Sequence, residues 1–194
     1  MPTLLIHPRR DEHRLWRMVD DATDVEVVNA ASVGGALSEM ADRRAGGALE
    51  ACLAWLADHP DVDGDRLGVL GLDGGGTHAY LLACTSRRLA CAVAVDPVVV
   101  RPSLSAERPV QPLELALNLS CPIALHFSAR GAAGSEDAER LRATLDQFAK
   151  EAEVRVHDGD VLLGAGERYD DAVPRGPRAA ALAFLRTHPE EPPS

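Results

Sequence analysis

The chain has 194 residues, 46% hydrophobic and 26% charged, a balance that supports one hydrophobic core and argues against intrinsic disorder. Its formal net charge of −10 is not offset by any basic block, which argues against nucleic acid and anionic membranes as partners. The sequence has no apolar stretch of membrane-spanning length and no signal-peptide pattern, so we expect a cytoplasmic protein.

The predicted strands are short apolar runs bounded by polar or turn residues. They cover Thr3–Ile6, Asp24–Val28, Leu67–Leu72, Leu89–Val95, Cys121–Phe127 and Glu153–His157. Helical spacing alternates with them and predicts helices over Asp11–Asp20, Ser38–His59, Thr77–Ser86, Ser135–Lys150 and Arg178–Thr187. Strands that are apolar throughout are typical of a parallel sheet covered on both faces. We therefore predict an α/β fold with a mostly parallel sheet of about six strands and helices on both faces.

The chain shows no repeat, so we predict one domain over residues 1–188, with 189–194 as a flexible tail. The least regular segment is 98–120, which contains three prolines and is a candidate lid or excursion over the site. The four cysteines form no CxxC pair and have no histidine at metal-ligand spacing. We expect them to be buried thiols, and we expect no metal and no cofactor.

A glycine-rich turn follows the predicted strand Leu67–Leu72. Residues 67–76 read LGVLGLDGGG, which places Asp73 in a G-x-D-x-G pattern between a buried strand and a helix. In α/β hydrolases the nucleophile sits on such a tight turn, and small flanking residues are needed because the backbone there is strained. Asp73 is therefore a candidate nucleophile.

This turn resembles that of the dienelactone hydrolases, an α/β-hydrolase family that reads as strand, G-F-C-x-G-G, helix. Residues 62–68, VDGDRLG, are similar to the V-D-x-x-R-[IL]-[GA] segment that precedes the family's turn, and residues 168–185 are similar to the family's end. The resemblance extends from Leu4 to His188, without the family's N-terminal hairpin. It implies an α/β-hydrolase fold, shortened at its N-terminal side, that acts on a small ester, lactone or related metabolite.

The resemblance also implies an incomplete catalytic triad. It places Asp73 where the family has its Cys nucleophile, Gly131 where the triad acid stands, and Leu162 where the catalytic His is expected. A carboxylate at the turn can still react, either as a nucleophile, as in haloalkane dehalogenases and epoxide hydrolases, or as a general acid/base. The alternative is that Asp73 caps the following helix, which begins near Gly75.

Other candidates for the site stand at the ends of predicted strands. Asp96 is a candidate catalytic acid, or else a turn residue before Pro97. His157 is a candidate base and His126 a candidate substrate-binding residue or base, because both point to the carboxyl edge where parallel sheets bind ligands. The alternative for each histidine is a buried or surface residue without a catalytic role.

The remaining candidates bind substrate or an oxyanion. Gly74 supplies a backbone N–H at the start of the helix, and His7, Arg9, Arg10 and Arg130 fall near the same edge. Exposure to solvent without a function is the alternative for the arginines. His78 lies one turn into the helix, and its spacing predicts a packing role.

Two classes of function remain open. The first is an enzyme that acts on a small molecule through Asp73. The second is a catalytically degenerate homologue that binds a small ligand or acts as an interaction subunit, which the missing His and acid favour. A shortened sheet exposes an edge, so we also expect a two-fold homodimer.

Overall fold

A computed structural model describes residues 3–6, 27–29, 41–60, 62–72, 74–129, 134–158 and 175–188. Several predicted features lie outside this part of the chain. They are the helix Asp11–Asp20, the tail 189–194, and the residues His7, Arg9, Arg10, Asp73, Arg130, Gly131 and Leu162.

The described residues form strands and helices in the predicted order. The strands are β1 (Thr3–Ile6), β2 (Val27–Asn29), β3 (Leu67–Leu72), β4 (Leu89–Val95), β5 (Ile123–Ser128) and β6 (Ala152–His157). The helices are α2 (Asp42–Ala57), α3 (Gly74–Thr85), α4 (Gly134–Gln147) and α5 (Arg175–Thr187), with the 3₁₀ helix η3 (Pro112–Asn118) between β4 and β5. None of these helices is long and apolar enough to cross a bilayer.

All six strands are parallel and pair in the order β2-β1-β3-β4-β5-β6. The predicted fold class is confirmed. Every residue of β3, β4 and β5 is buried, which explains why these strands read as continuous apolar runs. In β6 exposed and partly buried residues alternate over most of the strand, as suits an edge strand.

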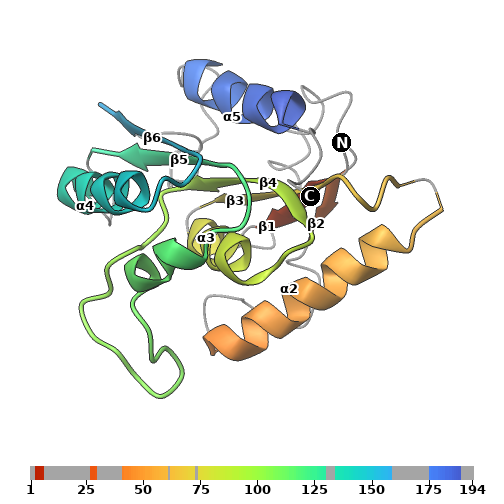
Figure 1. The fold of residues 1–194 in the computed structure, drawn as a ribbon, viewed down its shortest axis with the longest axis horizontal. Coiled ribbons are helices and arrows are strands. Elements are labelled where there is room, and N and C mark those ends of the chain that lie inside the picture. Colours follow the sequence, from red (N-terminus) through yellow and green to blue (C-terminus); the bar gives the residue numbers. More distant parts are fainter. Residues whose placement is uncertain are drawn as a thin grey trace, which may run out of the picture.

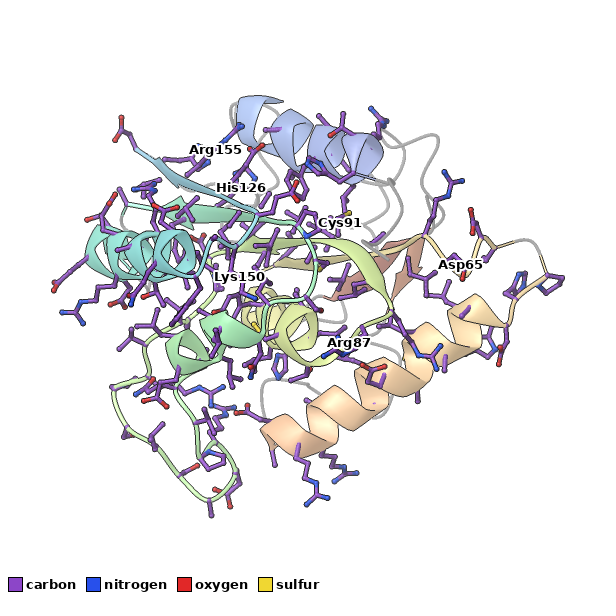
Figure 2. All side chains as sticks on the ribbon, in the orientation of Figure 1. Asp65, Arg87, Cys91, His126, Lys150 and Arg155 are labelled. Carbon is purple, nitrogen blue, oxygen red and sulfur yellow. The ribbon has the colours of Figure 1, made fainter. Side chains whose placement is uncertain are left out.

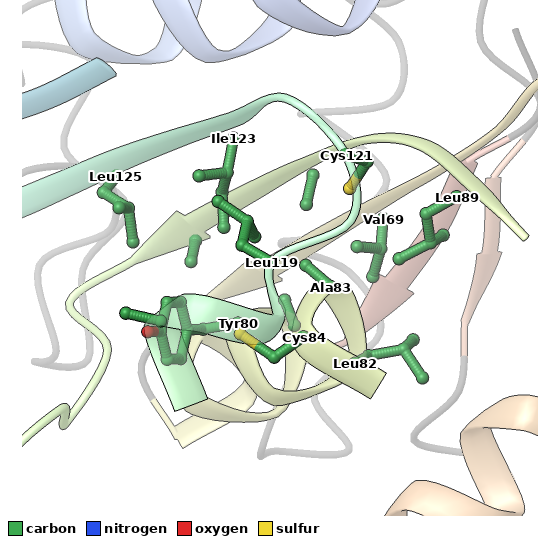
Figure 3. Packing of buried hydrophobic residues seen from close by; sticks show 14 of the residues in the cluster. Val69, Tyr80, Leu82, Ala83, Cys84, Leu89, Leu119, Cys121, Ile123 and Leu125 are labelled. Atoms are coloured by element: carbon green, nitrogen blue, oxygen red, sulfur yellow. The ribbon is translucent and has the colours of Figure 1, made fainter. Parts of the chain in front are cut away.

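Helices cover both faces of the sheet (Figure 1). The larger core cluster joins α2, α3 and α4 to one face, with residues such as Leu49, Val69 and Leu141. Figure 3 shows its centre, where the buried Tyr80 of α3 lies below the strands. The smaller cluster packs Leu182 and Leu185 of α5 on the opposite face.

Helix α4 ends at Gln147, three residues before the predicted end. Ala149 adopts a left-handed conformation with φ 49°, and the Lys150 N–H donates to the Leu145 carbonyl at 2.9 Å. This is a Schellman ending, which usually has glycine at the position of Ala149. The predicted end of this helix was too late because the sequence lacks the glycine that would have marked it.

The irregular segment 98–120 is anchored to the start of α2. The Arg101 guanidinium donates to both carboxylate oxygens of Asp42, at 2.6 and 2.9 Å, and the Asp42 N–H donates to the Glu107 carbonyl. The Gln111 side chain accepts a hydrogen bond from the Arg101 N–H through its amide oxygen and donates one to the Arg101 carbonyl through its amide nitrogen. These contacts tie the excursion to the helical face opposite α5.

The cysteines are thiols, as predicted, with one difference in burial. Cys84, Cys91 and Cys121 are buried, whereas Cys52 on α2 is only partly buried. Burial raises the pKa of Cys84 and of Cys91 to about 12, so both stay protonated at neutral pH.

Candidate active site

The connection from β3 to α3 consists of one residue, Asp73, because the strand ends at Leu72 and the helix begins at Gly74. A Cβ atom added to Gly71 would lie 2.1 Å from the Gly75 carbonyl oxygen, and one added to Gly76 would lie 2.2 Å from the Val95 carbonyl oxygen. Only glycine allows such close approach of helix to strands. The sequence thus builds a strand-to-helix elbow at position 73.

Helix α3 begins at Gly74, three residues before the predicted start at Thr77 and one before the start near Gly75 that a capping role for Asp73 implies. The three glycines of the predicted turn form the first turn of α3, and Gly75 and Gly76 are buried. Glycine costs about 1 kcal/mol relative to alanine inside a helix. Tertiary packing against β3 and β4 requires glycine at Gly76 and overrides this preference.

His78 has the packing role that its spacing predicts. It is 7% exposed, and its Nδ1–H donates to the Gly74 carbonyl at 2.9 Å. Burial lowers the pKa of His78, which keeps the ring neutral. Its hydrogen bond is made to the first residue of α3 and stabilises the helical turn next to the elbow.

A row of polar side chains continues along the carboxyl edge from the elbow. Asp96 follows β4, Ser128 ends β5 and His157 ends β6, and Ser128 pairs with His157 in the sheet register. His126 lies two residues before Ser128, so the two side chains share a face of β5. The neighbouring Ala124 packs with α5, which places this row on the α5 side of the sheet.

Hydrogen bonds to residues of β5 fix both the backbone and the carboxylate of Asp96. Its backbone is left-handed, with φ 48°, and its N–H donates to the His126 carbonyl at 2.8 Å. The Ser128 N–H donates to one carboxylate oxygen at 2.6 Å, and the Ser128 hydroxyl donates to the other at 2.7 Å. The left-handed conformation is uncommon for a non-glycine residue and costs energy. The turn at Asp96 therefore directs its carboxylate toward Ser128.

His126 and His157 form a pair that the sequence did not predict. The Nδ1 atom of His126 lies 3.0 Å from Nε2 of His157, and the rings stack at a centroid distance of 5.3 Å and an angle of 18°. His126 is 1% exposed, and Figure 2 shows it on the sheet face below α5, near Arg155. The sequence shows that His126 and Ser128 lie on the same face of one strand. It does not show how this strand is aligned with β6, and that register brings His126 next to His157.

Burial and neighbouring positive charge keep both rings neutral at pH 7. Burial, followed by the charges of His157 and Arg155, lowers the pKa of His126 to about 4. Burial and then the charge of Arg155 also lower the pKa of His157, while the charges of Asp96 and Asp158 act in the opposite direction. A neutral imidazole has one lone pair with which to accept a proton.

The strand order sets how far His157 lies from the elbow. Three steps separate β3 from β6, roughly 14 Å at about 4.8 Å per step. The His157 ring contacts His126, so it leans from β6 toward the neighbouring strand β5. Among the described residues, no group of His, Cys, Asp or Glu is arranged to hold a metal ion.

The model of the dienelactone hydrolase family matches residues 9–162 of this chain. This range includes β3, the elbow residue, α3 and the strands β4 to β6. The chain belongs to the dienelactone hydrolase family. The resemblance drawn from the sequence of the elbow is thereby confirmed.

One named relative and two solved structures are similar to this chain. A curated protein of Bradyrhizobium sp. named as a probable 2-oxo-3-(5-oxofuran-2-ylidene)propanoate lactonase is 28% identical over 173 residues, 84% of this chain and 67% of the relative. A structure assigned as a dienelactone hydrolase from Klebsiella pneumoniae superposes with a TM-score of 0.80 at 18% identity, covering 96% of this chain and 86% of that one. The structure of an esterase from Pyrococcus furiosus superposes with a TM-score of 0.73 at 14% identity, covering 97% of this chain and 83% of that one. The two structures show the shared fold.

Proposed function

We propose that the protein hydrolyses a small ester or lactone, with Asp73 as the reacting carboxylate. The observation that carries this proposal is the one-residue connection between the buried strand β3 and helix α3, which close glycine contacts enforce. Family membership and the lactonase name of the Bradyrhizobium relative support the substrate class.

The start of α3 supplies the electrostatics that this reaction needs. The first N–H groups of a helix have no partner within the helix and carry partial positive charge. When a carbonyl carbon is attacked, its oxygen becomes negative and is stabilised by such donors. We assign this role to the Gly74 N–H.

Asp73 can react in two ways with the same neighbours. As a nucleophile, it attacks the carbonyl carbon, the ring C–O bond breaks, and the departing oxygen takes a proton from solvent; one water then hydrolyses the anhydride, which releases the hydroxy acid and restores the Asp73 carboxylate. As a general base, it takes a proton from water while the water oxygen attacks the carbonyl carbon; the ring C–O bond then breaks, and Asp73 returns the proton to the departing oxygen. In the nucleophilic route we assign the proton of the water that hydrolyses the anhydride to His157, whose ring is neutral.

Asp96 and the substrate-binding residues complete the proposal. We assign Asp96 an electrostatic role, since its negative charge favours the protonated form of His157. His7 and Arg9 follow β1, which pairs with β3, and Arg130 follows β5, so all three belong to chain segments that leave the carboxyl edge. They are proposed to bind the substrate; His126 is left out of this set because the residue is 1% exposed.

Mass spectrometry of quenched His157→Gln protein separates the two routes. After mixing with α-angelica lactone, a small unsaturated lactone, the nucleophilic route accumulates protein heavier by one lactone, because the water that hydrolyses the anhydride lacks its base. The general-base route gives no adduct. A wild-type protein that opens none of a panel of small lactones would contradict the proposed function.

Generic esters should be poor substrates, and p-nitrophenyl acetate turnover should be slow or absent. A carboxylate is a weaker nucleophile than the thiolate of the family, and Leu162 stands where the family His is expected. Release of p-nitrophenolate, followed by absorbance, checks this. Ordinary esterase rates that disappear in Asp73→Asn would refute it and indicate a conventional hydrolase.

We also propose that the protein is cytoplasmic and forms a two-fold dimer through a sheet edge. Within the described residues β2 and β6 are the outermost strands of the sheet, and an unpaired edge readily pairs with a second copy. Sedimentation velocity at micromolar concentration should give a dimer. A single monomer species at high micromolar concentration would exclude it.

The second candidate function is ligand binding without turnover. Both described donors to the Asp96 carboxylate come from Ser128, and no histidine of the described residues hydrogen-bonds to it. A site without a working triad could still hold a lactone at the carboxyl edge. A lactone that raises the melting temperature of the protein and is recovered unopened would favour this candidate.

A further inference from the structure

The contact between His126 and His157 joins a buried side chain of the inner strand β5 to a side chain of the edge strand β6. His126 is 1% exposed on β5, whereas His157 ends the edge strand β6 and is only partly buried. The short Nδ1 to Nε2 distance of 3.0 Å and the near-parallel rings fix the position of the His157 ring from the buried side.

We propose that His126 is a positioning residue that orients His157 as the base, in the role that the family gives to a triad acid. This inference rests on the function proposed above for His157. In a nucleophilic site the base needs a third group that fixes its ring and its tautomer. The sequence resemblance puts Gly131 at the position of the family acid, and glycine has no side chain to do so.

The two ring nitrogens of His157 then have separate tasks. The Nε2–H donates to the lone pair on Nδ1 of His126, which leaves the Nδ1 lone pair of His157 to accept a proton. Once His157 is protonated, the same bond becomes charge-assisted and stronger. The proton stays on His157 because burial disfavours charge on His126, whose pKa is lowered to about 4.

Among the described residues, three charged groups act on the pKa of His157. Arg155 and Asp158 lie on its own strand segment and Asp96 at the end of β4. The described charged side chain of α5 is Arg186, in its last turn, and His188 follows the helix and lies 3.7 Å from Glu151, the residue before β6. Substituting His126 leaves these charged groups in place, so a change in the His157 titration reports the loss of the contact with His126.

Two substitutions of His126 separate the effect of its hydrogen bond to His157 from the effect of its ring packing. His126→Phe keeps a stacked aromatic ring in the core but removes the acceptor nitrogen, whereas His126→Gln keeps an acceptor. The imidazole signals are followed by NMR against pH, with His188 as the internal reference. We expect the His157 titration to move to lower pH in His126→Phe, to return toward the wild-type curve in His126→Gln, and the His188 signal to stay unchanged.

Kinetics with α-angelica lactone test the role in the reaction. We expect His126→Phe to lower kcat about 10- to 100-fold with KM within about twofold. In a His157→Gln background the same substitution should lower kcat by less than about twofold, because residues that act through one another are not additive. Melting temperatures of all variants show which are folded.

Two results would overturn the inference: equal losses of kcat in both backgrounds, or an unchanged His157 titration in His126→Phe. If wild-type protein opens no lactone, the proposed function fails separately. The NMR titration then still decides whether His126 orients His157.

Discussion

Asp73→Asn should lower lactone turnover by about 100-fold or more while the melting temperature changes by less than about 2 °C. Asparagine has the size of aspartate and caps a helix about as well, so the elbow and the start of α3 keep their structure. The amide, however, neither attacks a carbonyl carbon nor takes a proton from water. Steady-state rates and thermal melts of the same preparations provide the measurement.

The matched control is Asp65→Asn, on the exposed turn before β3 and at the opposite end of that strand. It removes the same charge from the chain and should leave both turnover and melting temperature unchanged. If Asp73→Asn retained wild-type turnover, Asp73 would be a helix cap only. A loss of both turnover and stability would instead indicate that the carboxylate is needed for the fold.

The fold was predictable because its signals are local. The runs Leu67–Leu72 and Leu89–Val95 are apolar over their full length, and this is how strands buried on both faces appear in a sequence. Element ends were less predictable. The start of α3 and the end of α4 depend on contacts of Gly76 and on the left-handed Ala149, and such contacts arise only in the folded chain.

The site was predictable strand by strand but not as a set of contacts. Asp96, His126 and His157 were each predicted as candidates because residues at the ends of parallel strands meet at one edge. Which of them touch depends on register and on the turn at Asp96. The structure joins Asp96 to Ser128, and His126 to His157. Ser128 was overlooked because a serine at the end of an apolar strand reads as an ordinary strand boundary.

Gly76→Ala should destabilise the protein by about 3 kcal/mol, which lowers the melting temperature of a chain of this length by about 6–12 °C. The added Cβ would lie 2.2 Å from the Val95 carbonyl oxygen, a backbone atom of the central strand β4 that cannot rotate away. The helix must therefore move away from the sheet. Because the elbow joins β3 directly to α3, this movement also displaces the first N–H groups of the helix, and lactone turnover in the folded fraction should fall.

Gly47→Ala supplies the control, since it makes the same change inside helix α2 where a Cβ meets nothing within 4 Å. There alanine should stabilise the protein by about 0.5–1 kcal/mol and leave turnover unchanged, because glycine in a helix interior loses more conformational freedom on folding. Opposite shifts in melting temperature for the two substitutions would show that close packing, and not helix propensity, determines the glycine at position 76. A Gly76→Ala protein as stable and active as wild type would mean that α3 is not held against β4 and that the elbow tolerates a side chain there.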